Sequence, residues 1–371
     1  MNHLDSFEQC QHDICGTEQY HGRSSLDKTQ TDNYTENFGN FIDQYKLYLH
    51  EERMYAKHLR RTFSVVGWTL VIYYVLMNTA VAMVMMVDVV RKMLPMIVEN
   101  PNYELDTNAL VEMATQNGWG YIMAVVIGLF VLLVWKGKDY WRNEIFAKGK
   151  PMTVGTFFAV MSITLGVQLA ASLLSSVLEL LLNQFGLSMM SVLESTSGQS
   201  NSFSMFVYAS ICAPVTEEIL FRGFVQRSLQ PYGKKFAIFG SAVLFGLFHG
   251  NLIQTPYAFM VGLVLGYVAA EYNVIWAMVL HMVNNMVLAD LLTRVTSAIS
   301  AGLNEIVTGI VIIGFGIAAV VILIVKRKEI GAYLRQERMD RRALKNFFIN
   351  GGVITLTVLM LANLLLLITA I

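Results

Sequence analysis

The sequence predicts an all-α, polytopic integral membrane protein with about eight or nine transmembrane helices. Hydrophobic residues make up 55% of the 371 residues, and the mean hydropathy is +0.50. Charged residues account for 15%, whereas soluble domains contain about 25%. Long apolar runs also recur along the chain. A helix that crosses the hydrocarbon core of a bilayer needs about 20 predominantly apolar residues, and several runs approach that length.

The chain begins with a polar region, residues 1–62, which we expect to be a cytosolic N-terminal tail. Residues 1–49 contain eight acidic and three basic residues, together with many Gln, Asn, Thr and Ser. Such a composition buries too little apolar surface to fold by itself. We therefore expect most of residues 1–49 to be disordered, with a helix only near 41–48.

The remaining chain divides into N-terminal transmembrane helices (63–200), a helical core (201–296) and C-terminal transmembrane helices (297–371). The run at 236–250 is short for a full span. Within the last region, residues 326–346 form a basic cytosolic connector, for which a solvated segment is favoured over an amphipathic helix lying on the membrane. The candidate spans are 63–90, 119–135, 154–182, 203–226, 236–250, 254–271, 274–293, 305–325 and 348–370.

The distribution of Lys and Arg predicts that the N-terminus is cytosolic, because cytoplasmic loops are enriched in these residues. Four basic residues precede the first run, five follow the second and eight lie in 326–345. In contrast, the loop at 93–118 contains four acidic residues and no Lys or Arg. The predicted location is a cell membrane, and the overall composition has a bacterial character.

Composition also excludes several function classes. The formal net charge is zero, so no basic field indicates a nucleic-acid partner. Three cysteines (Cys10, Cys15 and Cys212) are too few for a disulfide framework. The chain contains no Rossmann or P-loop glycine pattern. The expected partners are the lipid bilayer and a membrane-associated peptide or protein; the sequence does not specify an oligomeric state.

Glu217, Glu218 and Arg222 lie inside a segment that is otherwise apolar enough to cross the membrane. An acidic residue at the centre of such a helix costs about 2.5–3.5 kcal/mol, so each needs a partner or a function. Glu218 and Arg222 are four residues apart and can pair on one helix face. Glu217 is rotated by about 100° from Glu218 and lacks that partner, which makes it a candidate general base.

Two further polar motifs follow on later apolar runs. His249 ends Phe245-Gly-Leu-Phe-His249, and His281 and Asn285 share a face in His281-Met-Val-Asn-Asn285. A structural interpretation is also available for each motif, because membrane histidines and asparagines often form interhelical hydrogen bonds. Taken together, the groups could activate a water and stabilise a developing negative charge, as peptide-bond hydrolysis requires. GxxxG spacings at Gly246–Gly250 and Gly262–Gly266 favour close helix approach there.

The ordered set Glu217-Glu218-x3-Arg222, Phe245-x3-His249 and His281-x3-Asn285 resembles the CAAX protease and bacteriocin-processing (CPBP) family. This family of intramembrane proteases includes the Rce-one type prenyl-protein peptidases and the Abi-type bacterial proteins. The resemblance covers residues 204–295, which would make 201–296 the catalytic core. It implies an intramembrane endopeptidase that acts on a membrane-associated protein, a prenylated protein or a peptide precursor.

The same resemblance implies a role for each motif residue. Glu217 would be the base that activates the attacking water together with His249. His281 and Asn285 would stabilise the oxyanion of the tetrahedral intermediate. We expect Glu217 and His249 to lie close together, with the His281–Asn285 pair across a water-sized gap.

Glu218 and Arg222 would shape the site as an ion pair. Whether a metal takes part is left open by the resemblance, because many CPBP members are labelled metalloproteases while other accounts of the family need no metal. Glu217, His249 and His281 could hold a zinc ion with a water in the fourth position. No HExxH motif is present.

Alternative functions remain at this level. Cys212 could be a nucleophile. Its angular position on the helix, however, matches neither that of Glu218 nor that of a histidine on the same helix. A non-catalytic membrane scaffold or immunity protein would need the polar groups only for binding. An ion-coupled transporter is less favoured, because the polar groups cluster on three consecutive runs without an inverted repeat.

Overall fold

The computed structural model describes residues 28–99, 117–147, 149–189, 202–286, 301–336, 339–367 and 369–370. The chain divides into two compact units, Met1–His58 and Leu59–Ile371. The three polar motifs all lie in the second unit. Within the described residues, the only strands are β1 (Leu187–Ser188) and β2 (Thr369–Ala370), which form one short antiparallel pair.

The first helix, α2 (Lys28–Glu99), begins earlier and ends later than the sequence predicts. Residues 28–49 are helical, although a helix was expected only near 41–48. No proline precedes Pro95 in α2, and a polar helix can be stable when solvent surrounds it and side chains pair along it. Lys46 and Asp43 form such an exposed ion pair at 3.1 Å. Residues 1–27 of the predicted tail lie outside the described residues.

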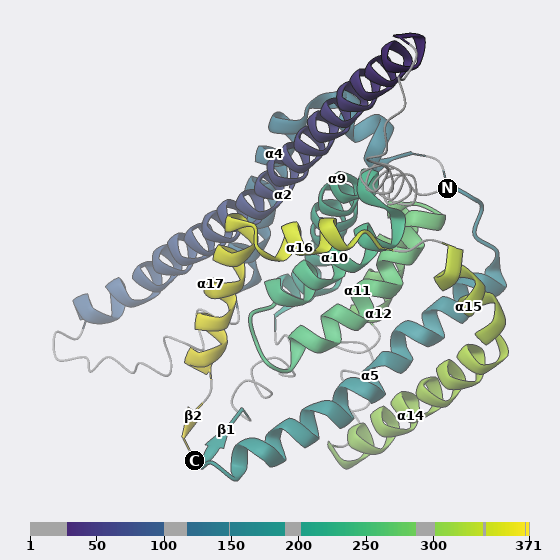
Figure 1. Ribbon diagram of the computed structural model, residues 1–371. Coiled ribbons are helices and arrows are strands. Elements are labelled where there is room, and N and C mark those ends of the chain that lie inside the picture. Colours follow the sequence, from purple (N-terminus) through teal and green to yellow (C-terminus); the bar gives the residue numbers. More distant parts are fainter. Residues whose placement is uncertain are drawn as a thin grey trace. The chain divides into compact units, whose positions relative to one another are not determined.

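The other elements follow along the chain as shown in Figure 1. They are α4 (Gly118–Tyr140), η1 (Trp141–Ile145), α5 (Val154–Asn183), α7 (Phe203–Val207), η2 (Tyr208–Cys212), α8 (Ala213–Glu218), η3 (Ile219–Gln226), α9 (Arg227–Leu229), η4 (Gln230–Tyr232), α10 (Lys234–Phe248), α11 (Gln254–Glu271), α12 (Val274–Asn285), α14 (Ala301–Val325), α15 (Arg327–Gln336), α16 (Arg341–Phe348) and α17 (Gly351–Leu367).

This architecture confirms an all-α, polytopic membrane protein, but it contains fewer long spans than the sequence predicts. In the described residues, five helical stretches are long and apolar enough to cross a membrane: Ile42–Glu99, Gly118–Ile145, Val154–Asn183, Phe203–Tyr232 and Ile306–Val325. A sixth is possible if α16 and α17, which meet at 56°, form one broken span. The helices α10, α11 and α12 are not among these spans.

Helices α10 and α11 pack closely because small residues line their contact. A methyl group added to Gly246 would lie 2.7 Å from the Thr255 carbonyl oxygen, and one added to Gly262 would lie 3.1 Å from Ala242 Cα. Gly250 has a φ of +61°, a backbone conformation that glycine adopts without strain, and it follows the end of α10. Of the glycines in the two predicted GxxxG spacings, Gly246 and Gly262 therefore lie at close helix contacts, and Gly250 lies just beyond the end of α10.

The described parts of the basic connector, residues 326–336 and 339–346, are mostly helical, whereas the sequence favoured a solvated segment over an amphipathic helix. Residues 326–346 contain α15 and most of α16, and Phe347 of α16 is fully buried. Its ring packs edge-on against Phe63 and Phe236, with centroids 5.6 and 5.7 Å away. Burial of this aromatic side chain anchors α16, whereas α15 has no buried residue.

Candidate functional site

The adjacent glutamates lie on an irregular helix. The stretch Phe203–Tyr232 is one span in which η2 and η3 have π-helical geometry. Pro214 is the second residue of α8, two positions after η2 ends, and a proline has no N–H to donate to the preceding turn. Single-turn π-helical segments occur often at functional sites, where they change the direction of side chains and free a carbonyl.

Glu218 lies at the centre of a buried ion-pair network. Its side chain is fully buried, and its Oε1 atom lies 3.0 Å from Arg222 Nη1 and 2.9 Å from His281 Nδ1. The Glu218–Arg222 contact is the i,i+4 pair that the sequence suggests. Because a carboxylate only accepts, His281 donates from Nδ1. This bond fixes the ring and turns Nε2 away from Glu218.

Arg222 also ties its helix to α11. Its Nη2 atom donates to the Gly262 carbonyl at 3.3 Å, and one turn later Gln226 Nε2 donates to the Gly266 carbonyl at 2.9 Å. The guanidinium carbon lies 4.3 Å from the centroid of the Phe245 ring, a cation–π distance. Arg222 is thus held by α11 and α10 as well as by Glu218, which explains how a fully buried arginine is tolerated.

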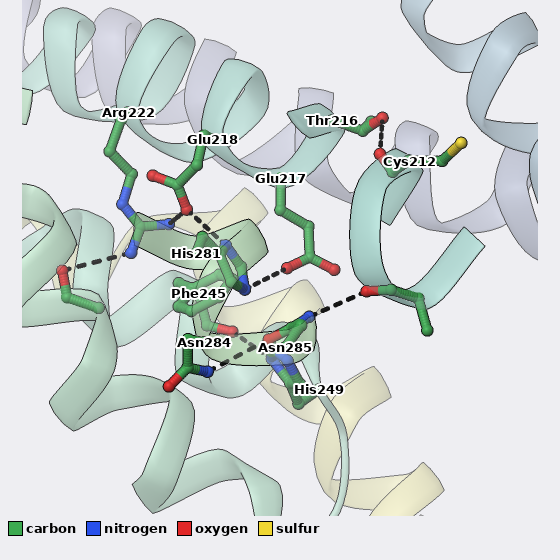
Figure 2. A network of polar contacts seen from close by, with 12 residues as sticks. Cys212, Thr216, Glu217, Glu218, Arg222, Phe245, His249, His281, Asn284 and Asn285 are labelled. Atoms are coloured by element: carbon green, nitrogen blue, oxygen red, sulfur yellow. Dashed lines mark hydrogen bonds and ion pairs between the residues drawn. The ribbon is translucent and has the colours of Figure 1, made fainter. Parts of the chain in front are cut away.

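Glu217 has a different environment from its neighbour. Its side chain is 29% exposed, whereas that of Glu218 is 0% exposed. Its Oε2 atom lies 3.8 Å from His281 Nε2, so His281 stands between the two carboxylates (Figure 2). The carboxylate that can meet water is therefore Glu217, and the histidine within 4 Å of it is His281 rather than His249.

His249 lies one turn beyond Phe245, directly after the end of α10. Its Nδ1 atom donates to the Phe245 carbonyl oxygen at 2.9 Å, so Nε2 is the atom left to face the site. The Phe245 ring makes edge contacts with His249 and His281 at centroid distances of 4.9 and 5.8 Å. The structure therefore brings His249 to the same cluster, with Phe245 between the two histidines (Figure 2).

Asn285 is held by a hydrogen-bond chain that includes two residues not assigned a role from the sequence. Its Nδ2 atom donates to the Ala209 carbonyl of η2 at 3.0 Å, and its Oδ1 atom accepts from Asn284 Nδ2 at 3.2 Å. Asn284 is also bonded to the Tyr257 hydroxyl, at 2.9 Å from Nδ2. A second asparagine beside Asn285 was visible in the sequence, whereas no pattern distinguishes Tyr257 from other core tyrosines.

A partly open cavity of about 230 Å³ lies beside Glu217. Four tyrosines and two phenylalanines contribute to its lining, which comes from α2, α4, η2, α8, η3 and α10. Among the described residues that line it, Glu217 is the only acidic one. Water or a substrate in this cavity can therefore reach the Glu217 carboxylate.

A protein site for zinc needs at least three side chains whose donor atoms converge on one point. Across the described ranges, no three His, Cys, Asp or Glu side chains are placed so that they could bind one metal. Hydrogen bonds hold Nδ1 of His281 and of His249, which leaves Nε2 of each ring as its possible metal donor. Because these atoms and the Glu217 carboxylate do not converge on one point, the three side chains as arranged do not fit the zinc site that the sequence leaves open.

Cys212 is not placed as a nucleophile. Its carbonyl oxygen accepts a hydrogen bond from Thr216 Oγ1 at 2.8 Å, and its thiol points away from Glu217 and the histidines in Figure 2. A cysteine nucleophile needs a base within hydrogen-bond reach. The arrangement therefore favours a carboxylate-centred site.

Comparison with known proteins supports the resemblance seen in the motifs. Residues 199–287 match the family model described as Type II CAAX prenyl endopeptidase Rce1-like. No curated protein and no solved structure matches the chain. The matched segment contains all three polar motifs, which the fold gathers into one cluster, and the match supports the resemblance to the CPBP family of CAAX-type intramembrane proteases.

Proposed function

We propose that the protein is an intramembrane endopeptidase in which Glu217, assisted by the two histidines, activates a water that hydrolyses a peptide bond. The observation that carries this proposal is the difference between the two adjacent glutamates. Glu218 is fully buried and bound by Arg222 and His281, whereas Glu217 is 29% exposed beside a cavity. A partly exposed carboxylate that meets water is suited to act as a general base.

In the proposed reaction, Glu217 takes a proton from water while the water oxygen attacks the carbonyl carbon of the substrate. His249, with Nδ1 held by Phe245, presents Nε2 to the same water. The resulting tetrahedral intermediate carries a negative oxygen. Collapse of the intermediate breaks the C–N bond, and the proton held by Glu217 passes to the leaving amine.

His281 and Asn285 are proposed to stabilise the negative oxygen. A protonated His281 would balance the charges of Glu217, Glu218 and Arg222, and its Nε2–H would then face the reaction site. The Asn285 amide has two N–H donors, one of which is used by Ala209, so one remains for the substrate. Donors fixed before the reaction stabilise a developing oxyanion without further reorganisation.

The substrate is proposed to be a membrane-associated peptide or protein, with prenylated proteins as one class to test. The N-terminus would be cytosolic and the site would be reached from the cytosolic half of the bilayer. Matched synthetic peptides with and without a prenylated cysteine can be incubated with the full-length protein in proteoliposomes in H₂¹⁸O. We expect cleavage with ¹⁸O in the new carboxyl group. Intact peptides in every reaction would contradict the proposal.

Catalysis is proposed to need no metal, because the described acidic, histidine and cysteine side chains do not converge on one point. Treatment of the active protein with a zinc chelator should therefore leave its cleavage rate unchanged. The Cys212→Ser variant should also retain the wild-type rate. Loss of activity on chelation, restored by added zinc, would show that the resting arrangement of Glu217, His249 and His281 changes to hold a metal.

A further inference from the structure

The cavity beside Glu217 has a wall that the matched family segment does not provide. Tyr73, Tyr74 and Asn78 of α2 and Tyr121 of α4 line it, and all lie outside residues 199–287. Phe248 of α10 completes an aromatic side, with its ring 5.7 Å from that of Tyr74. Residues outside the matched segment therefore shape the space next to the proposed base.

Tyr73 gives this wall a polar group that lacks a partner. Its side chain is 9% exposed, and its hydroxyl oxygen is buried with no hydrogen-bond partner among the described residues. Leaving a buried hydroxyl without a partner is unfavourable, so the packing of the ring rather than a hydrogen bond fixes Tyr73. The ring is held against α4, because a methyl group on Gly128 would lie 2.6 Å from Tyr73 Cε2.

The volume of the cavity limits what it can hold. An apolar cavity of about 150 Å³ is large enough to bind benzene, whereas pockets for drug-sized ligands measure about 300–1,000 Å³. At about 230 Å³, the cavity accommodates one bulky side chain rather than a whole ligand. Its aromatic lining favours an apolar or aromatic group.

We propose that this cavity is a substrate subsite that selects a bulky apolar or aromatic side chain next to the scissile bond. The inference rests on the proposed peptidase function, because Glu217 in the cavity wall places the attacked carbonyl at its edge. The side chain of the adjoining substrate residue would enter the cavity.

The first test compares selectivity in variants that alter the cavity without touching the polar cluster. Peptides that differ only in the residues flanking the cleaved bond are supplied as a mixture, and products are quantified by mass spectrometry. Wild type should prefer Phe or Leu to Ala at one flanking position by at least about tenfold, since one methylene in an apolar pocket changes discrimination by about 10- to 200-fold. Gly128→Ala, which pushes Tyr73 into the cavity, should reduce that preference at least about fivefold through a higher KM.

Gly120→Ala is the matched control in the same helix, because its methyl group would meet Val84 at an ordinary distance of 3.4 Å. This variant should keep the wild-type preference. Val81→Phe is a second cavity variant, which fills space from the α2 side without pressing on Tyr73. It replaces Gly128→Ala in the test if that variant does not fold. An unchanged preference in a folded cavity-filling variant would overturn the subsite.

Binding of indole provides a readout that does not depend on catalysis. Thermal unfolding of the full-length Glu217→Gln protein should shift upwards with indole, and Val81→Phe in the same background should abolish the shift. Equal shifts in both proteins would contradict the subsite. If wild type cleaves no peptide while indole still stabilises the protein in this cavity-dependent way, the proposed peptidase function fails but the cavity remains a binding site for aromatic groups.

Discussion

At the scale of single residues, the structure separates two glutamates that are adjacent in the sequence. Helical geometry alone predicts that Glu218 can reach Arg222, and the two lie 3.0 Å apart. The partner of Glu217 could not be predicted, because contacts between helices depend on the packing of the whole core. Sequence reasoning favoured His249, whereas His281 lies 3.8 Å from Glu217 and bonds to Glu218 as well.

The buried network should contribute to stability. Glu218→Ala leaves Arg222 and His281 without their shared carboxylate, and removal of one partner of a buried ion pair costs about 3–5 kcal/mol. We expect a loss of that size in the free energy of unfolding, measured by denaturation in detergent micelles. Glu144→Ala, at an exposed position of η1, should change the stability by less than about 0.5 kcal/mol. Equal stability of the two variants would show that the pair is not a structural element.

At the scale of helices, apolar runs predicted where most elements lie but not their lengths or local geometry. The runs at 154–182 and 305–325 correspond closely to α5 and α14. The π-helical segments η2 and η3 could not be predicted, because hydropathy carries no information on how the backbone hydrogen bonds are registered. The same limit applies to α10, which ends at Phe248 and places His249 at the helix end.

The α5–α14 contact offers a direct test of helix packing. A methyl group on Gly166 of α5 would lie 2.7 Å from the Phe315 carbonyl oxygen, whereas one on Gly155 would meet nothing within 4 Å. Gly166→Ala should destabilise the protein by about 1–3 kcal/mol through overpacking. Gly155→Ala in the same helix should stay within about 0.5 kcal/mol of wild type. Thermal unfolding in micelles can compare them, and equal midpoints would refute the close contact.

Two adjacent phenylalanines test whether the basic connector is anchored. Phe347 is fully buried, and Phe348 is 46% exposed. Phe347→Ala should cost about 3–5 kcal/mol in unfolding free energy, the usual range for a buried phenylalanine. Phe348→Ala should cost much less, because it loses little buried area. If both variants unfold at the same denaturant concentration, α16 is not anchored as described.

At the scale of the whole molecule, the charge pattern predicts an orientation in the membrane. Single cysteines can be introduced into a variant in which Cys10, Cys15 and Cys212 are replaced by serine. In intact cells, a membrane-impermeant maleimide should label Glu99→Cys but not Lys138→Cys or Lys328→Cys, since basic loops stay in the cytosol. The two lysine positions should label after permeabilisation. The reverse pattern would invert the proposed topology and move the site to the other half of the bilayer.

The central claim is that the exposed carboxylate of Glu217, and not the buried one of Glu218, activates water. It is tested most directly by the single-turnover rate of peptide cleavage by Glu217→Gln, beside wild type and Glu144→Gln at equal amounts of folded protein. The exposed position of Glu217 predicts a folded variant whose rate falls by about 10²- to 10⁴-fold, the usual contribution of a general base, with Glu144→Gln unchanged. A Glu217→Gln rate within about threefold of wild type would contradict the account, because a glutamine side chain cannot accept the proton from water.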